Sequence, residues 1–327
     1  MCIRNFLFWA RTILLVLAAL VVGSCGGGSQ DVSSASATRN GSRAAVKALV
    51  FSNVGFTGNG WYWDPNASGT GMAVEAQGDS GFVGLFMYDD AGKPVWYVST
   101  GTFSNGDSGK VQFTGDLRKF FGGQTLGGAW KAPSSVSVGT LNIAFTGSGK
   151  ATKALVSLPG GRSWSTERFN FNGLDTLNPD TQPETGWFWN PAESGRGYAI
   201  EVQNNQIFMA MFHYAADGSP TWNIVQDTIS ADGRVTSSKL WKYSNGQTLA
   251  GNYKAPSNPV ADGVTNLDFG APCAGRISFN NWAAIAIQRF KFSTLDDSEI
   301  CQTTSMVSTV AGVTRGTNGA AAEAQFS

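Results

Sequence analysis

Residues 60–96 read GWYWDPNASGTGMAVEAQGDSGFVGLFMYDDAGKPVW, and residues 186–222 read GWFWNPAESGRGYAIEVQNNQIFMAMFHYAADGSPTW. The two stretches align without a gap, and both combine a Gly-Trp pair, alternating apolar residues and a Gly-containing turn. Self-similarity on this scale indicates that the chain consists of two copies of one folding unit. We therefore expect a first module at 48–173 and a second at 185–301, joined by a linker at 174–184.

The composition predicts an all-β protein. The chain has 41 glycines in 327 residues, 12% aromatic residues and only 14% charged residues. Turn signals recur about every 8 to 12 residues, which is typical of a sandwich or a barrel. Eight short segments per module are closed most simply as an antiparallel up-and-down barrel, which leaves no exposed edge. Two tandem barrels are the prediction, and two β-sandwiches are the alternative. The expected strands are 60–64, 69–77, 81–89, 94–103, 109–115, 138–146, 150–157 and 163–172, then 186–190, 195–203, 206–214, 220–229, 233–240, 263–269, 275–280 and 283–292.

Alternation within the strands indicates which faces are covered. In the segment 69–77, Met72 and Val74 alternate with Glu75 and Gln77, so one face is apolar and the other is polar or small. The segment 81–89 is apolar on both faces, and such a strand has to be covered on both sides. We therefore expect the outer walls of the third and fourth strands of the two modules to pack against each other.

The N-terminus predicts export. Residues 1–24 have a basic start, an apolar run from Ile13 to Val22 and a small-residue end, which together are typical of a signal peptide. The end, Val22-Gly23-Ser24-Cys25, resembles the lipobox of bacterial lipoproteins. The resemblance implies that Cys25 becomes the first mature residue and carries acyl chains that anchor the protein stably in a membrane. Gly26 then favours the outer membrane over the inner one.

Two segments flank the modules without contributing to a core. Residues 25–47 are small and polar and predict a flexible tether, and residues 302–327 predict a disordered tail. Removing the signal peptide leaves two more acidic than basic residues, and no cluster of lysines or arginines with aromatic residues occurs. Nucleic acid is therefore not an expected partner.

The cysteines and the histidine limit the possible chemistry. Cys2 leaves with the signal peptide and Cys25 is lipidated, so Cys273 and Cys301 remain. In an exported protein this pair predicts a disulfide. A single histidine, His213, cannot form a zinc cluster with two paired cysteines. No metal or cofactor is expected.

The ends of each module resemble the calycins, the group that includes lipocalins and avidins. Each module opens on a Gly-Trp pair, Gly60-Trp61 or Gly186-Trp187, and its last strand carries Arg168 or Arg289. In calycins a first-strand tryptophan is covered by a last-strand arginine or lysine. The resemblance implies a barrel fold and no particular function. The repeat also resembles tandem modules of secreted proteobacterial proteins.

Candidate catalytic residues are few. Gly78–Gly81 and Gly106–Gly109 both spell GDSG, the segment around the nucleophile of chymotrypsin-like proteases, but both fall at predicted turns. The only histidine that could serve as a base, His213, belongs to the other module. The sequence therefore offers no credible catalytic constellation.

Glu75 and Glu201 occupy equivalent strand positions. We expect Glu75 to pair with Arg168 and Glu201 with Arg289, as structural ion pairs in the barrel interiors. Contact with a ligand is the second possibility for these carboxylates. A hydrolase of an envelope polymer, with the two glutamates facing each other in a groove between the barrels, is a further alternative.

The aromatic residues suggest a binding function. Tryptophans and tyrosines at a barrel mouth or groove, together with amide and carboxylate side chains, suit a carbohydrate or a small amphipathic ligand. Packing of the same aromatics in a filled core is the alternative, since small barrels leave little lumen. We expect a membrane-anchored lipoprotein with a non-catalytic binding or envelope-interaction role; a purely structural surface protein is another possibility. The candidate ligand-binding residues are Trp61, Trp63, Glu75, Gln77, Tyr88, Trp96, Trp187, Trp189, Glu201, Gln203, Tyr214 and Trp222.

Overall fold

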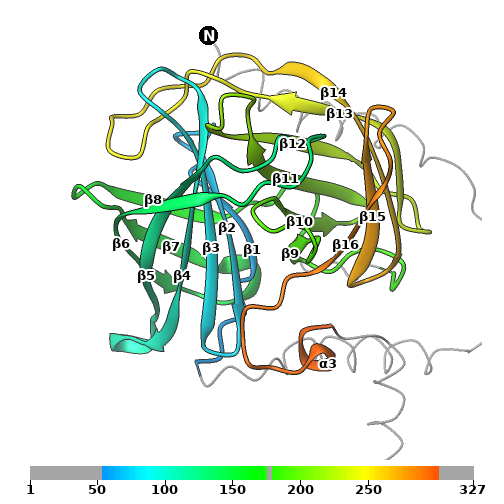
Figure 1. Cartoon of the computed structure of the whole chain (residues 1–327). Coiled ribbons are helices and arrows are strands. Elements are labelled where there is room, and N and C mark those ends of the chain that lie inside the picture. The colour runs from blue at the N-terminus through cyan, green and yellow to red at the C-terminus, as the bar shows by residue number, and fades with distance from the viewer. Residues whose placement is uncertain (1–53, 175–178, 302–327) are drawn as a thin grey trace, which may run out of the picture.

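The computed structural model of the chain describes residues 54–174 and 179–301. It is all-β apart from short helical turns, and its sixteen strands form two closed barrels side by side (Figure 1). No helix within the described ranges is long and apolar enough to cross a membrane. The predicted signal peptide, the lipidated Cys25, the tether and the tail lie outside the described residues.

The first barrel follows the chain around its circumference. Its strands are β1 (Gly60–Trp63), β2 (Gly71–Gln77), β3 (Ser80–Tyr88), β4 (Pro94–Asn105), β5 (Val111–Phe121), β6 (Ser134–Thr146), β7 (Lys153–Ser157) and β8 (Ser163–Arg168). All neighbours are antiparallel, and β1 closes the ring on β8, with Tyr62 opposite Arg168. Every strand therefore has two partners, and the sheet has no free edge.

The second barrel repeats this order. Its strands are β9 (Gly186–Trp189), β10 (Gly197–Gln203), β11 (Gln206–Tyr214), β12 (Pro220–Thr228), β13 (Arg234–Lys242), β14 (Val260–Ala271), β15 (Ala274–Phe279) and β16 (Ile285–Arg289). The ring closes between β9 and β16, with Phe188 opposite Arg289. The prediction of two eight-stranded up-and-down barrels is confirmed, and the sandwich alternative is not.

The largest difference from the predicted strands lies in β5 and β6. β5 was expected at 109–115, but it continues through Asp116 and Arg118 to Phe121, and β6 begins correspondingly early. Asp116 and Arg118 form an exposed ion pair of 2.7 Å on the solvated side of the barrel, while Leu117 between them is fully buried. Buried and exposed residues alternate through this part of β5, but its charged residues led us to end the predicted strand too early.

Each barrel is filled mainly by side chains of its own strands. In β2, Met72 and Val74 lie on one face, as the alternation predicted, and that face points into the first barrel; Tyr198 and Ile200 of β10 do the same in the second. Burial of a large apolar side chain contributes roughly 1.5–3 kcal/mol, so each interior is a substantial core.

Each barrel extends one loop onto the other barrel, and we call these two segments the exchange loops. The first exchange loop, residues 122–133 between β5 and β6, places Leu126 against the core of the second barrel. The second exchange loop, residues 245–256 between β13 and β14, places Leu249 against the core of the first. Each loop also forms a bridge with a strand of the other barrel, Thr125 with Tyr214 and Thr248 with Tyr88. The two barrels therefore share part of their cores.

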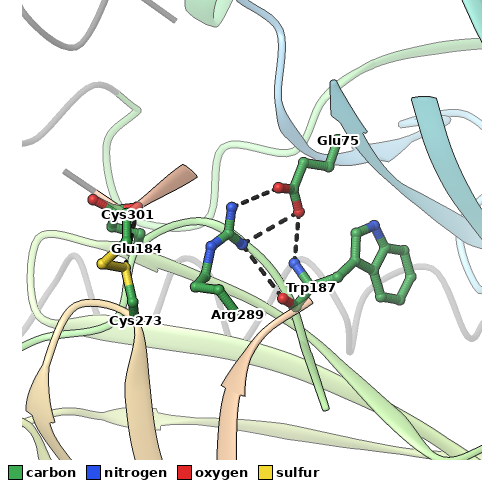
Figure 2. The surroundings of a disulfide bond; sticks show 6 residues. All are labelled: Glu75, Glu184, Trp187, Cys273, Arg289 and Cys301. Atoms are coloured by element: carbon green, nitrogen blue, oxygen red, sulfur yellow. Dashed lines mark hydrogen bonds and ion pairs between the residues drawn. A yellow bond between two sulfur atoms is a disulfide. The ribbon is translucent and has the colours of Figure 1, made fainter. Parts of the chain in front are cut away.

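The predicted disulfide is present. Cys273, in the turn between β14 and β15, is bonded to Cys301, directly after the short helix α3 (Asp297–Ile300) (Figure 2). The bond closes a segment with a sequence separation of 28 residues. In the chain-entropy model a loop of this length stabilises the folded state by roughly 3–4 kcal/mol.

Candidate functional site

The tryptophans predicted to contact a ligand lie between the barrels. Trp61 and Trp96 from the first barrel meet Trp187 and Trp222 from the second, and all four are almost fully buried. They belong to an apolar cluster that we call the inter-barrel layer. This layer confirms that the outer walls of the third and fourth strands pack against each other. Its buried members are Trp61, Ala73, Phe82, Phe86, Tyr88, Trp96, Val98, Trp187, Ala199, Ala210, Tyr214, Trp222 and Ile224.

The other aromatic candidates complete this interface. Tyr88 and Tyr214 are fully buried, and each is covered by the exchange loop that comes from the other barrel. Trp63 and Trp189 are half-buried, and their rings pack against phenylalanines that follow the last strand of their own barrel. A ligand could reach most of these side chains only if the barrels came apart.

The glutamates and arginines pair across the interface, which corrects the predicted pairing within each barrel. Glu75 contacts Arg289 at 2.5 Å and Glu201 contacts Arg168 at 2.7 Å, and all four side chains are buried. The prediction placed them in the barrel interiors. Glu75 and Glu201 occupy outward-facing positions of β2 and β10, so the arginine within reach is the one from the other barrel.

Figure 2 shows the geometry around Glu75. The Arg289 guanidinium donates to both carboxylate oxygens, at 2.5 and 3.2 Å, and the backbone N–H of Trp187 donates to Oε2 at 2.7 Å. Gly186 has a positive φ of 151°, and a Cβ there would lie 1.6 Å from Arg289 Nη1. The glycine of the Gly-Trp pair therefore makes room for the arginine.

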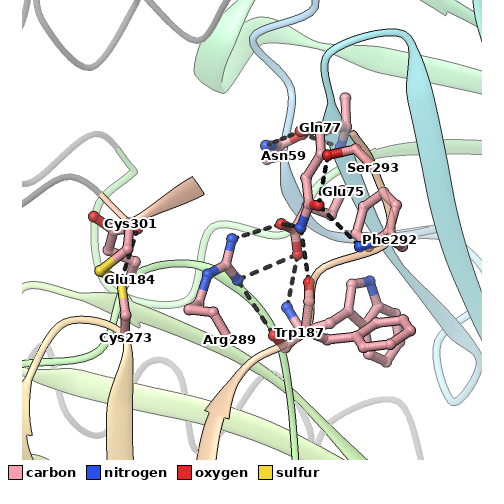
Figure 3. Close-up of polar contacts among 12 residues, drawn as sticks. Asn59, Glu75, Gln77, Glu184, Trp187, Cys273, Arg289, Phe292, Ser293 and Cys301 are labelled. Atoms are coloured by element: carbon pink, nitrogen blue, oxygen red, sulfur yellow. Dashed lines mark hydrogen bonds and ion pairs between the residues drawn. A yellow bond between two sulfur atoms is a disulfide. The ribbon is translucent and has the colours of Figure 1, made fainter. Parts of the chain in front are cut away.

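Gln77 extends this network (Figure 3). Its Nε2 donates to Glu75 Oε1 and to the carbonyl of Phe290, both at 2.8 Å, and its Oε1 accepts from the N–H of Phe292 at 3.1 Å. Gln203 makes the equivalent three contacts in the other half of the interface. The polar candidates thus serve as buried links between the barrels.

The interface has twofold pseudo-symmetry. The indole N–H of Trp96 donates to the carbonyl of His213, and that of Trp222 donates to the carbonyl of Met87, both at 3.0 Å. The ion pairs, the glutamine contacts and the exchange loops are reciprocated in the same way. This is the isologous pattern found between identical subunits, realised here within one chain.

The symmetry breaks at one edge of the interface. There an open groove of about 720 Å³ lies between residues 119–131 of the first barrel and the β11–β12 turn, residues 215–220, of the second. We call it the Gly122 groove, because a Cβ at Gly122 would meet no atom within 4 Å. Such a volume is typical of a small-molecule site.

The equivalent position on the other edge is filled. Asn245 stands where the first barrel has Gly122, and its Nδ2 donates to Ser257 Oγ at 3.0 Å. Its Oδ1 lies so close to Gly92 that a Cβ there would be 2.2 Å away. The Asn245 side chain therefore occupies, at its edge of the interface, the space that Gly122 leaves open at the other edge.

A second asymmetry adjoins the Gly122 groove. In the end of the second barrel, His213 Nε2 lies 2.7 Å from Asn223 Oδ1, and Asn223 Nδ2 donates to Asp262 Oδ2 at 3.1 Å. His213 and Asn223 are buried, whereas Asp262 is exposed. Burial lowers the pKa of His213 to about 4, so the imidazole is neutral at pH 7.

The equivalent end of the first barrel has no such chain. Met87, Tyr97 and Val138 occupy the positions of His213, Asn223 and Asp262, and all three pack into its core. The polar substitutions are thus concentrated at the barrel end that the first exchange loop covers. The backbone N–H of Tyr214, which follows His213, donates to the Gln124 carbonyl of this loop at 3.2 Å.

None of the residues that line the Gly122 groove is among the site residues predicted from the sequence. The signal was available in the differences between the aligned copies, at positions such as Gly122 and Asn245, rather than in their shared residues. Among the described residues, no group of three or more His, Cys, Asp or Glu side chains is arranged to hold a metal ion. No family model, no curated protein and no solved structure matches this chain.

Proposed function

We propose that this protein is an exported, lipid-anchored binding protein without catalytic activity, and that the Gly122 groove is its ligand site. One observation carries the proposal. Two equivalent edges flank a pseudo-symmetric interface, and a groove lies at the edge with Gly122, whereas the side chain of Asn245 occupies the corresponding position at the other edge. The ligand expected from the sequence, a carbohydrate or a small amphipathic molecule, suits a groove of this size.

The anchor follows from the N-terminal sequence. Acylation of Cys25 would tether the two barrels to a membrane, with the outer membrane favoured by Gly26. Mass spectrometry of the N-terminal peptide tests this step by itself. We expect a diacylglyceryl group on the Cys25 sulfur, and an unmodified Cys25 in protein purified from membranes would contradict it.

The arrangement of the glutamates argues against a hydrolase. Glu75 and Glu201 are the carboxylates on which the hydrolase alternative depended, and each is held in a two-oxygen contact by an arginine. A general acid or nucleophile has to be accessible to a substrate and to water. Both side chains are at most 3% exposed. A binding role therefore agrees better with this geometry.

A glycan and lipid array tests the proposed site. The fragment from Ala45 to Cys301 contains both barrels and the disulfide, and we expect it to bind at least one class of sugar or amphiphile. Gly122→Asn, which copies the filled edge into the open one, should weaken that binding at least about ten-fold, or 1.4 kcal/mol.

Asn245→Gly is the matched control, because it changes the same pair of residues on the other edge. It should leave binding at the Gly122 groove unchanged. If the wild-type fragment binds nothing on either array, or if Gly122→Asn binds as well as wild type, the groove is not the site.

A further inference from the structure

We infer that the Gly122 groove takes an acidic carbohydrate, that is, a short sugar chain that carries carboxylates. The inference rests on the proposed function, since it names the ligand class for the same groove. Three properties of the lining residues support it: their charge, their exposed aromatic surface and the size of the space between them.

The lining carries positive charge that is not neutralised within the protein. Lys119 and Lys131 both line the groove, and neither forms an ion pair with any residue that the structure describes. Asp217 is the only carboxylate in the lining, and Lys93 from the first barrel binds it at 3.3 Å. The local field therefore attracts an anion.

The turn at the filled edge is more acidic than the turn that lines the groove. The second repeat keeps both lysines, and the β3–β4 turn at the filled edge has two aspartates where the β11–β12 turn at the groove has alanines. The filled edge thus has two aspartates in this turn, whereas the groove has the single aspartate Asp217, which Lys93 binds. The equivalent residues are Lys242 and Lys254, with Asp89 and Asp90 in place of Ala215 and Ala216.

Aromatic surface lies next to the lysines. Phe121 lines the groove and is 42% exposed, whereas its counterpart in the second repeat is Ser244. Trp130, between the lining residues Ala129 and Lys131, is half exposed, and its indole N–H donates to the Ser194 carbonyl of the second barrel at 3.1 Å. Exposed aromatic faces pack well against the C–H face of a sugar ring.

The space and the type of cation favour a sugar acid over a phosphate. A volume of about 720 Å³ falls within the range of small-ligand sites, so it accommodates a short oligosaccharide. No arginine lines the groove in the part of the chain that the structure describes. Two separate lysines act as point charges, which suit carboxylates spaced along a sugar chain. A single phosphate is better matched by the bidentate guanidinium group of an arginine.

Calorimetric titration of the wild-type fragment with oligogalacturonate, and with its methyl-esterified neutral form, tests the inference. We expect the acidic form to bind at least about ten-fold more tightly, and its affinity to fall as salt rises. Lys119→Gln/Lys131→Gln should abolish this preference. Ala215→Asp/Ala216→Asp, which copies the aspartates of the other edge, should do the same.

Lys242→Gln/Lys254→Gln is the matched control, and it should keep the preference for the acidic sugar. Equal affinity for the charged and neutral sugars, with no effect of the groove variants, would overturn the inference while leaving the groove as a binding site. Binding to vesicles with anionic phospholipid or to inorganic phosphate, without binding to the acidic sugar, would also overturn it. Binding that survives Gly122→Asn would remove the proposed site itself.

Discussion

The two edges of the inter-barrel interface are built from the same repeated sequence, yet they differ in what they leave accessible. On one edge Asn245 fills the space over Gly92, and the adjoining barrel end is apolar. On the other, Gly122 leaves a groove, and the adjoining barrel end contains the buried His213–Asn223 pair. The reciprocated contacts between these edges have the same chemistry in both halves. The residues that make the reciprocated contacts hold the two barrels together. The residues that differ between the edges are not needed for those contacts, so they can serve a function.

The buried ion pairs should produce the largest loss of stability. Arg289→Met leaves the Glu75 carboxylate buried without its partner, which costs about 3–5 kcal/mol. Arg168→Met should cost the same within about 1 kcal/mol, because the two halves of the interface are equivalent. Urea unfolding measures both values.

The double variant Glu75→Leu/Arg289→Met is the control for this comparison. It replaces the whole pair by apolar side chains, and it should be more stable than Arg289→Met alone. A loss below about 1 kcal/mol for Arg289→Met would mean that the pair contributes little to the interface. Unequal losses for the two arginines would show that the halves are not energetically equivalent.

The disulfide distinguishes the two barrels, since the first has no counterpart. Cys273→Ser/Cys301→Ser should lower the free energy of unfolding by roughly 3–4 kcal/mol, because the unfolded chain gains the entropy of an open loop. Thermal or urea unfolding under oxidising conditions measures the loss. Reducing agent should destabilise the wild type similarly and leave the double variant unchanged, and a further loss in the double variant would contradict this account.

His213 should make stability depend on pH. Its folded-state pKa of about 4 lies below the ordinary 6.5, so the unfolded state binds more protons between these values. The stability is fully present above pH 6.5 and falls as pH drops towards 4, by about 2–3 kcal/mol at that pH. His213→Met, which copies Met87 of the first barrel, should remove this component of the pH dependence. An unchanged pH profile would exclude His213 as its source.

The sequence was sufficient for the parts of the fold that alternation encodes. Alternation along β2 predicted that Met72 and Glu75 lie on opposite faces of the strand, and the two-sided apolar β3 predicted the contact between barrels. Alternation does not indicate which part of the other barrel an outward-facing residue contacts. The pairing of Glu75 with Arg289 instead of Arg168 therefore required the three-dimensional arrangement of the two repeats. The exchange loops were missed for the same reason, because Leu126 lies outside any strand pattern.

The smallest effect on stability is expected for Gly122→Asn and Asn245→Gly, which swap the residues that distinguish the two edges. Gly122 has φ 78° and Asn245 has φ 60°, and asparagine tolerates this left-handed conformation. A side chain at position 122 would enter open space, so Gly122→Asn should change the free energy of unfolding by less than about 1 kcal/mol. Asn245→Gly loses one exposed hydrogen bond and should cost a similarly small amount. Urea unfolding of both variants tests whether glycine at position 122 is required for the stability of the fold. A cost of several kcal/mol for Gly122→Asn would mean that the glycine is needed to fold, whereas a negligible cost together with lost binding would mean that it keeps the groove open.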